Sequence, residues 1–272
     1  MARYERILIT GAAGRLGSQL RTGIAPLAGR LRLADREPIG DLASHEEAAI
    51  FDLADMEATE SAVEGCDAIV HFGGAPEERP WEVVLDSTIR GSYHVYEAAR
   101  KHGVRRIVYA SSVHAIGYHE VDAHIGVDAP VRPDSLYGVS KVFVEGLSRL
   151  YWDKFGIETA CLRIFSSFPE PADRRHLWSY LSFADCVRLV EAALTAPRVG
   201  HTISFGMSDN RVKTVDNSGT HHLGYRPQDS SEPFRDKVEG STPVPDPKAP
   251  AVRYLGGYFT EIGHPDDGPS ET

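Results

Sequence analysis

Residues 6–17 read Arg-Ile-Leu-Ile-Thr-Gly-Ala-Ala-Gly-Arg-Leu-Gly, and this stretch decides the fold. Its first half is a short apolar run typical of a buried β-strand, and its second half places Gly11, Gly14 and Gly17 before a segment of helical periodicity. Small residues in such a turn let the backbone approach a pyrophosphate, whose charge then lies at the amino terminus of the helix. The stretch therefore predicts a strand–turn–helix unit that binds a dinucleotide.

An acidic residue follows at the distance that such a unit requires. Asp35 ends the next apolar run, 18 residues beyond Gly17. Its carboxylate is placed to accept a hydrogen bond from an adenosine ribose hydroxyl and would repel a 2′-phosphate, so the sequence favours NAD over NADP as cofactor. Arg15 and Arg36 are the side chains that could instead pair with such a phosphate.

The rest of the chain alternates apolar runs rich in β-branched residues with segments of helical period. Strands are expected at 6–10, 31–35, 48–52, 68–72, 106–111, 159–165 and 202–205, and helices at 16–27, 56–63, 81–102, 135–155 and 183–194. Alternation of this kind predicts parallel β-α-β units in one open sheet, covered on both faces. The expected fold class is thus α/β, with a doubly wound Rossmann-type sheet.

The composition changes in the last forty residues, from Pro233 onward. These residues hold seven of the 17 prolines. Four of them, at 243, 245, 247 and 250, each fix φ and remove a backbone donor, so we expect an extended rather than helical Pro-rich arm that covers the body of the protein.

Composition and charge exclude several classes of protein. The 272 residues carry 29 basic and 39 acidic side chains, a formal charge of −10, which is the opposite of what a nucleic-acid or anionic-membrane binder needs. The apolar runs are too short to cross a bilayer and the amino terminus lacks a signal-peptide core, so a cytoplasmic protein is expected. Cys66, Cys161 and Cys186 are widely spaced, as reduced thiols are, and no ligand spacing for a metal occurs.

A tyrosine and a lysine lie one turn apart at the start of an expected helix. The segment runs from Tyr137 to Lys141, and residues four apart share a helix face. A free tyrosine is a weak base at neutral pH, but a fixed positive charge beside it favours the phenolate and lowers its pKa. Ser111 and Ser112 end the preceding strand, where a hydroxyl can hold a substrate alcohol while the tyrosine takes its proton. The pattern predicts a general base for the oxidation of an alcohol.

Two further strand ends are candidates for cofactor contact, because ligands bind at the carboxyl ends of strands in open parallel sheets. Asp52-Leu53 follows the third strand, where the carboxylate could hold the adenine amine or form an ordinary turn. Gly73-Gly74 follows the fourth strand and suits a loop against the cofactor or a plain turn.

In combination, these motifs resemble the extended short-chain dehydrogenase/reductase family. The resemblance covers roughly residues 5–205. It implies a seven-stranded doubly wound sheet with an NAD-binding core over 1–165. It further implies that residues 166–272 form mainly a small C-terminal substrate lobe and arm. Within this range, residues 182–206 would belong to the core, as its last helix and strand.

The resemblance also implies roles for individual residues. Tyr137, Lys141 and Ser112 would be catalytic, with Ser112 preferred to Ser111 because it stands five residues before Gly117, as in the family motif. The residues implied to bind the cofactor are Gly11, Ala13, Gly14, Arg15, Leu16, Gly17, Asp35, Arg36, Asp52, Leu53, Gly73, Gly74, Tyr137 and Lys141.

Longer stretches are similar to one branch of this family, the uronate dehydrogenases, which oxidise glucuronate or galacturonate to an aldarolactone. The likeness is carried by residues 111–117, 132–141, 163–166, 216–218, 223–225 and 256–257. It implies an NAD-dependent oxidation of a hexuronic acid at C1. The residues implied to contact the sugar acid are Ser112, Val113, His114, Tyr137, Ser166, Arg175 and Pro76.

The chain departs from that branch at two of these positions. Val113 stands where an asparagine is usual, and Pro76 stands where a serine is usual. Both changes remove a polar contact, so the substrate could be a different sugar. The alternatives are an NAD-dependent nucleotide-sugar epimerase, another sugar dehydrogenase, or a regulatory protein that binds NAD without turnover. By analogy with the family, the long helices at 81–102 and 135–155 would assemble the chain into a homo-oligomer.

Overall fold

Seven parallel strands form the central sheet of the protein, for which a computed structural model describes residues 2–267. The strands lie in the order β10-β7-β5-β4-β1-β2-β3, and every neighbouring pair is parallel. Their bounds are β1 Tyr4–Thr10, β2 Ala28–Asp35, β3 Glu46–Ile50, β4 Ala68–His71, β5 Arg106–Ser112, β7 Glu158–Ile164 and β10 His201–Gly206. The strand order reverses between β1 and β4, so the predicted doubly wound sheet is confirmed and its ligand-binding crevice lies there.

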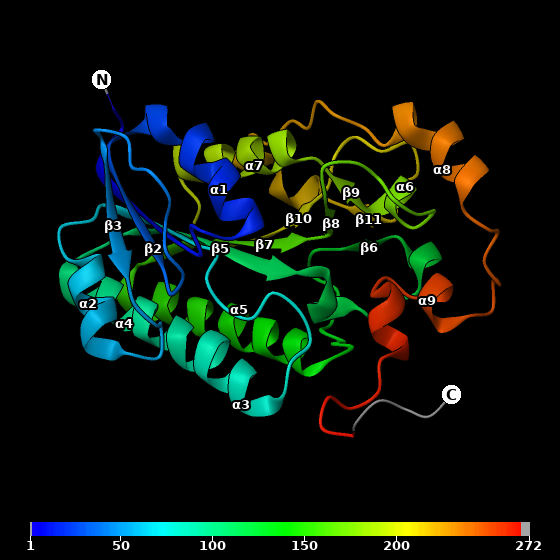
Figure 1. Cartoon of the computed structure of the whole chain (residues 1–272), viewed down its shortest axis with the longest axis horizontal. Coiled ribbons are helices and arrows are strands. Elements are labelled where there is room, and N and C mark those ends of the chain that lie inside the picture. Colours follow the sequence, from blue (N-terminus) through cyan, green and yellow to red (C-terminus); the bar gives the residue numbers. More distant parts are fainter. Residues whose placement is uncertain (1, 268–272) are drawn as a thin grey trace.

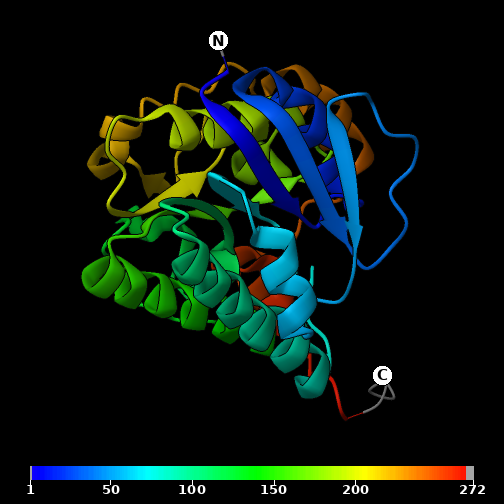
Figure 2. The same cartoon turned by 90° about the vertical axis from the view of Figure 1, so that its left-hand side faces the viewer.

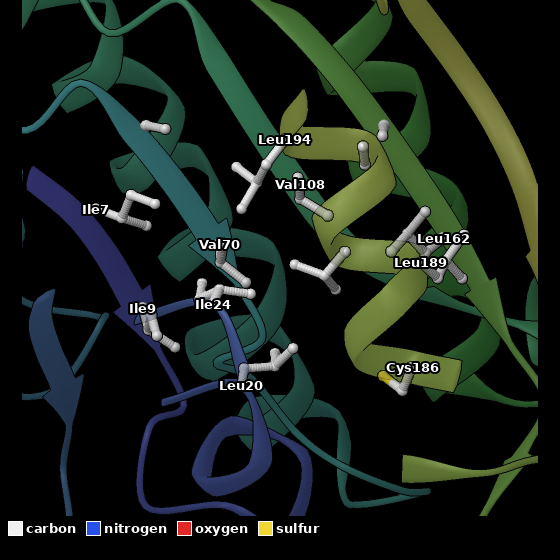
Figure 3. Packing of buried hydrophobic residues seen from close by; sticks show 14 of the residues in the cluster. Ile7, Ile9, Leu20, Ile24, Val70, Val108, Leu162, Cys186, Leu189 and Leu194 are labelled. Carbon is white, nitrogen blue, oxygen red and sulfur yellow. The ribbon is translucent and has the colours of Figure 1, made fainter. Parts of the chain in front are cut away.

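Helices cover both faces of this sheet (Figure 1; Figure 2 shows the two layers from the side). Helices α1 and α7 lie on one face, and Figure 3 shows strand residues such as Val70 and Leu162 packed against Leu20 and Leu189 of these helices. Helices α2, α4 and α5 lie on the other face over a second core. The bounds are α1 Arg15–Gly23, α2 Met56–Val63, α4 Gly91–His102, α5 Leu136–Phe155 and α7 Phe183–Thr195. Within residues 2–267, no helix has the length and apolar composition to cross a membrane.

Two expected helices are interrupted. The helix expected over 16–27 ends at Gly23 and continues as a 3₁₀ turn, Ala25–Leu27, because Pro26 lacks the N–H that an α-helix interior needs. The helix expected over 81–102 consists of α3 (Trp81–Val84), a π-helical segment at Leu85–Arg90, and α4. Within that segment Thr88 accepts a hydrogen bond from the Ala75 N–H at 3.0 Å, which ties the helix to the loop after β4.

A small lobe lies beyond the carboxyl ends of the strands (Figure 1). It holds two short parallel pairs, β6 with β11 and β8 with β9, and the one-turn helix α6. A third core of apolar side chains, including Val113, Phe165 and Leu255, joins the lobe to the ends of β5 and β7. The bounds of these elements are β6 Ile125–Gly126, β8 Ser166–Ser167, α6 His176–Ser179, β9 Tyr180–Leu181 and β11 Val215–Asp216.

The Pro-rich arm covers the lobe but is not extended throughout. The stretch 243–246 has no regular secondary structure, whereas α8 (Arg235–Ser241) precedes it and α9 (Pro250–Arg253) follows it, so the expectation of a non-helical arm is wrong at both ends. Pro250 occupies the first turn of α9, where its missing N–H has no helical partner to lose. Beyond α9 the chain is fastened to the body, because the Leu255 N–H donates to the carbonyl of His119 at 2.9 Å.

Substitution of Gly17 by alanine tests the close approach of α1 to the turn after β1. The new Cβ would lie 2.0 Å from the carbonyl oxygen of Gly11, so the helix would have to move. We expect Gly17→Ala to lower the free energy of unfolding by about 1–3 kcal/mol, as overpacking does. Urea denaturation measures the change. Gly240→Ala is the control, since nothing lies within 4 Å of the added Cβ and alanine favours the helix. Equal stability of Gly17→Ala and the unmodified protein would contradict this account.

Candidate active site

A single cavity of about 1190 Å³ lies at the carboxyl ends of the strands and runs from the glycine-rich turn to the arm. Every residue predicted for the cofactor or the substrate lines it: Gly11, Ala13, Gly14, Arg15, Leu16, Gly17, Asp35, Arg36, Asp52, Leu53, Gly73, Gly74, Pro76, Ser112, Val113, His114, Tyr137, Lys141, Ser166 and Arg175. Among the residues that the structure describes, no group of three or more His, Cys, Asp or Glu side chains is arranged to hold a metal ion.

The glycine-rich turn has the shape of a cradle for a pyrophosphate. Gly11 adopts φ +71°, and a Cβ there would lie 2.7 Å from the backbone of Phe72. Helix α1 begins directly after Gly14, and its first turn carries no acidic residue, so the positive end of the helix dipole faces the cavity uncancelled. These features fit a dinucleotide with its phosphates at the amino terminus of α1.

The side chains that would meet the adenosine half are held by local contacts. Asp35 accepts hydrogen bonds from the backbone N–H of Ala13 at 2.9 Å and of Glu37 at 3.1 Å, which orient its carboxylate beside the turn. Arg36 lies largely exposed, 3.6 Å from the Glu37 carboxylate. The guanidinium of Arg15 stacks 4.4 Å from the centre of the Phe168 ring. Each arginine thus has a neighbour within the chain, an exposed carboxylate for Arg36 and an aromatic ring for Arg15.

Asp52 and the Gly73-Gly74 pair lie in turns after their strands and also line the cavity. The Asp52 carboxylate accepts from the Ala54 N–H at 2.9 Å, which is the turn-forming contact that the sequence left open. Gly73 donates its N–H to the Thr10 hydroxyl at 3.0 Å and so ties the ends of β4 and β1 together.

Tyr137 and Lys141 enter the cavity from the first turns of α5, and both are buried. The helix begins where the Ser135 hydroxyl accepts from the Gly138 N–H at 3.0 Å. The ammonium of Lys141 donates to the carbonyl of Ala110 at 2.8 Å and lies 5.1 Å from the centre of the Tyr137 ring. Helical spacing and a strand carbonyl together place the two side chains next to each other.

Burial controls the protonation of this pair. It raises the pKa of Tyr137 to about 12, an effect that the Ser112 hydroxyl opposes in part. It also lowers the pKa of Lys141 to about 7, which the charge of Glu145 opposes. The sequence led us to expect a lowered pKa for Tyr137, which is wrong for this structure: desolvation of the phenolate is the largest cause of the shift and raises the pKa.

The two serines at the end of β5 face different partners. The hydroxyl of Ser111 donates to Glu145 Oε1 at 2.6 Å and is committed to that buried carboxylate. The Ser112 hydroxyl interacts with Tyr137 and accepts from the His114 N–H at 3.2 Å.

At the far end of the cavity, Arg175 is a partly buried cation that the lobe and the arm hold in place. Its Nη1 donates to the Ser166 hydroxyl and its Nη2 to the carbonyl of Leu255, both at 2.6 Å. Its Nε is buried and has no hydrogen-bond partner. Burial lowers the pKa of this guanidinium to about 10, so it stays charged at neutral pH. A guanidinium held in this way at the cavity wall is suited to a planar anion such as a carboxylate.

His114 lies between Tyr137 and the arm. Its Nδ1 is 2.8 Å from Asp134 Oδ2, its ring stacks on Phe259 at a centroid distance of 3.8 Å, and its edge meets the Tyr137 ring at 5.6 Å. Burial lowers the pKa of this imidazole and Asp134 raises it in part. With Nδ1–H directed at the carboxylate, Nε2 is the ring atom that accepts a hydrogen bond.

The two positions that depart from the uronate dehydrogenase pattern lie in different surroundings. Val113 is buried in the third core with Leu255 of the arm. Pro76 is exposed at the margin of the cavity. The apolar side chain of Val113 is thus part of the packing between the arm and β5, and not only a wall of the cavity.

Residues that sequence analysis missed complete the site through contacts between distant segments. Glu78 accepts from the N–H of Leu136 at 3.0 Å and of Tyr137 at 2.8 Å, and so caps the helix that carries the tyrosine. No local pattern links position 78 to position 137. Phe259 and Asp134 were missed for the same reason, although Asp134 directly precedes the Ser135 cap and its place in the motif could have drawn attention.

A glycine-rich turn at the switch point of a doubly wound sheet, with a Tyr-x-x-x-Lys helix beside it, defines an oxidoreductase of the short-chain class. The family model for the NAD dependent epimerase/dehydratase family matches residues 7–182. The chain belongs to this family.

Similarity to individual members extends over nearly the whole chain. A uronate dehydrogenase of Pseudomonas putida is 49% identical over 96% of this chain and 97% of its own length. The crystal structure of a glucuronic acid dehydrogenase from Chromohalobacter salexigens has a TM-score of 0.95 and 46% identity, covering 97% of this chain and 99% of the other. A uronate dehydrogenase from Agrobacterium tumefaciens, solved as a tyrosine-to-alanine mutant complexed with NAD, has a TM-score of 0.92 and 47% identity, covering 95% of this chain and 98% of the other.

Glu78→Gln tests the cap on the catalytic helix. In the unmodified protein the two carboxylate oxygens of Glu78 accept from two backbone N–H groups. Glutamine has the same size, but one of these oxygens becomes an NH₂ group, which cannot accept a hydrogen bond from a backbone N–H. We expect the free energy of unfolding to fall by about 0.5–2 kcal/mol, as for other lost helix caps. Chemical denaturation measures it. Glu77→Gln is the control, because Glu77 is exposed and caps nothing. A loss of equal size in both variants would rule out the capping role.

Proposed function

We propose that this protein is an NAD-dependent dehydrogenase that oxidises a hexuronic acid, glucuronate or galacturonate, at C1 to the aldarolactone. The observation that carries the proposal is the charged guanidinium of Arg175 on the wall of the same cavity as Tyr137. A substrate with an alcohol at one end and a carboxylate at the other fits that pair of groups. The uronate dehydrogenases to which the chain is similar support the same substrate class.

The cofactor is NAD, which accepts a hydride at its nicotinamide when bound. The residues that would hold it are Gly11, Ala13, Gly14, Arg15, Leu16, Gly17, Asp35, Arg36, Asp52, Leu53, Gly73, Gly74, Tyr137 and Lys141. The amide groups at the start of α1 meet the pyrophosphate, and the Asp35 carboxylate meets the adenosine ribose. Lys141 meets the nicotinamide ribose.

The chain's own groups handle the proton. Ser112 holds the anomeric hydroxyl, and the phenolate of Tyr137 removes its proton while the hydrogen on C1 leaves as hydride. The C1–H bond breaks, C1 becomes the carbonyl carbon of the lactone, and the proton stays on Tyr137. Because burial alone raises the pKa of Tyr137 to about 12, the positive charges of Lys141 and of the oxidised nicotinamide are needed to favour the phenolate.

The opposite end of the sugar acid is fixed by the small lobe. Arg175 and Ser166 bind the carboxylate, and Nε2 of His114 accepts from a ring hydroxyl. Val113 and Pro76 also line the cavity and offer no side-chain donor.

The alternatives receive less support. A nucleotide-sugar epimerase needs room for a nucleotide beyond the sugar, and the arm, whose Phe259 stacks on His114, takes up space at that end of the cavity. A regulatory NAD-binding protein has no use for a buried Tyr137 beside Lys141 and Ser112. Another sugar dehydrogenase remains the second candidate, because the two departures at Val113 and Pro76 alter the polar lining.

We further propose that the protein is a cytoplasmic homo-oligomer with a small-molecule sugar acid as its substrate. The three cysteines are buried free thiols, which suits a reducing compartment. Tyr93 on α4 and Phe143 and Leu150 on α5 are between 41% and 46% exposed, large apolar side chains that an assembly through these helices would cover. Light scattering measures the molar mass, and a monomer would contradict the assembly.

The proposed activity is tested by the absorbance of NADH in a mixture of the protein, NAD and either uronate. Glucose and NADP are the controls for the carboxylate and for the cofactor. NADH formation with uronates and not with glucose supports the proposal. Turnover of neutral sugars alone would favour the second candidate, and tight NAD binding with no turnover of any sugar would favour the regulatory protein.

Tyr137→Phe removes the phenolic oxygen and leaves the ring. We expect turnover to fall by about 10²–10⁴-fold, the usual contribution of general base catalysis, while NAD binding stays largely intact. Steady-state kinetics and calorimetric titration with NAD measure the two effects. Appreciable activity in this variant would exclude Tyr137 as the base.

Arg175→Ala removes the cation from the cavity wall. We expect the KM for uronates to rise about tenfold or more, because hydrogen bonds between charged groups contribute about 1.5–3 kcal/mol, with far less effect on a neutral aldose. Arg174→Ala is the matched control: Arg174 fastens the arm through the carbonyl of Glu239 at 2.9 Å. Equal changes in KM for charged and neutral sugars would remove the carboxylate role from Arg175.

A further inference from the structure

Glu145 is a buried carboxylate to which the reaction above assigns no task. It lies on α5, one helical turn beyond Lys141, and is 5% exposed. Arg163 on β7 forms a two-pronged ion pair with it, Nε to Oε1 at 2.9 Å and Nη2 to Oε2 at 2.8 Å. The Ser111 hydroxyl on β5 donates to the same Oε1 at 2.6 Å. Because a buried ion pair adds little net stability, the cluster needs an explanation other than the fold.

The packing of α5 against the carboxyl end of β5 places this cluster next to Tyr137, Lys141 and Ser112. The last three residues of β5 each face one of three residues that lie four apart on α5 and so share a face of that helix. The facing pairs are Ala110 with Lys141, Ser111 with Glu145, and Ser112 with Tyr137. Ser111 lies between Ala110 and Ser112 on the strand, so movement of the Ser111–Glu145 pair would displace both of these neighbours.

We propose that Glu145 is a positioning residue for the dehydrogenase reaction, an inference that rests on the proposed function. Through Ser111 it fixes the end of β5 that carries Ser112, and its negative charge faces the ammonium of Lys141. Arg163 holds the Glu145 carboxylate in one orientation by binding both of its oxygens. The bond to Ser111 also leaves Ser112 as the serine hydroxyl that meets the substrate.

The charge on Lys141 depends on Glu145 because the other groups around the ammonium are neutral or cationic. The surrounding titratable groups are Tyr137 and Glu145 on α5, Tyr109 on β5, His71 on β4 and, behind Glu145, Arg163 on β7. Burial lowers the pKa of His71 to about 3 and raises that of Tyr109 far above its usual value, so neither carries charge at neutral pH. Glu145 is then the anion that opposes the burial of Lys141.

The sign of the pH effect follows from this arrangement. Lys141 is charged below its pKa of about 7, and Glu145 raises that pKa against the effect of burial. Removal of the carboxylate leaves Arg163 as an unbalanced cation, so the pKa of Lys141 falls further. As the pH rises, Lys141 then loses its proton at a lower pH than in the unmodified protein, and the activity falls with it.

The test measures the titration of Lys141 directly. Protein labelled with ¹³C at the lysine Cε gives one NMR signal per lysine, and loss of a signal in Lys141→Met identifies the right one. We expect Glu145→Gln, which keeps the size of the side chain, to lower the midpoint of Lys141 by about one pH unit or more, as the loss of a neighbouring opposite charge does. The alkaline limb of the pH profile of kcat should move the same way.

Two further variants separate charge from position. Ser111→Ala keeps the ion pair and frees the end of β5, so kcat on uronates should fall while the midpoint of Lys141 stays. The double variant Glu145→Gln/Arg163→Met removes both charges, and its midpoint should lie between those of Glu145→Gln and the unmodified protein. Replacing both partners of a buried pair is well tolerated, so this variant keeps the test available if Glu145→Gln does not fold.

The proposal is overturned if the titration midpoint of Lys141 is the same in Glu145→Gln as in the unmodified protein and kcat is lowered by the same factor at every pH. The cluster would then be a structural ion pair only. A double variant with a midpoint as low as that of Glu145→Gln would also contradict it. The NMR titration needs no substrate. If the midpoint moves as expected but the unmodified protein oxidises no sugar acid, the proposed function fails and the charge link stands.

Discussion

The contact between the carboxyl end of β5 and one face of α5 is the constraint on which the site depends. It desolvates Tyr137 and Lys141 together, which raises the pKa of the phenol and lowers the pKa of the ammonium. In such a dry environment, one nearby charge has a much larger effect than it would in water. The proton transfer therefore depends on a few charged groups at fixed positions, which are Lys141, the carboxylate of Glu145 and the bound cofactor.

The sheet and the cofactor cradle could be predicted because their signals are local. A strand that runs into Gly11, Gly14 and Gly17, followed by Asp35, is contained within thirty residues, and each later strand and helix shows its own periodicity. The spacing of Tyr137 and Lys141 is equally local, since it follows from the pitch of one helix.

The parts that could not be predicted depend on contacts between distant segments or on burial. Glu78 caps a helix that begins 58 residues later, and Phe259 reaches His114 across most of the chain. The π-helical segment at Leu85–Arg90 lies inside what the sequence predicted as one continuous helix. The direction of the pKa shift at Tyr137 was missed because the four-residue spacing predicts that Lys141 is nearby but does not predict how deeply the phenol is buried.

The arm completes the substrate end by close packing around Asp134. A Cβ on either Gly117 or Gly256 would lie 1.8 Å from Asp134 Oδ2, so only glycine at both positions lets the arm, the β5 loop and the start of α5 meet. The same contact orients His114, and the arm's Leu255 carbonyl orients Arg175. The arm is thus a wall of the cavity and a support for two of its polar groups.

The most direct test of the proposed reaction follows the hydrogen on C1. Galacturonate carrying deuterium at C1 is incubated with the protein and NAD, and the nicotinamide is analysed by mass spectrometry and NMR. The account predicts one deuterium per reduced cofactor, a lactone without deuterium, and net accumulation of the reduced form. Deuterium that remains in the sugar, with no reduced cofactor formed, would contradict the oxidation at C1.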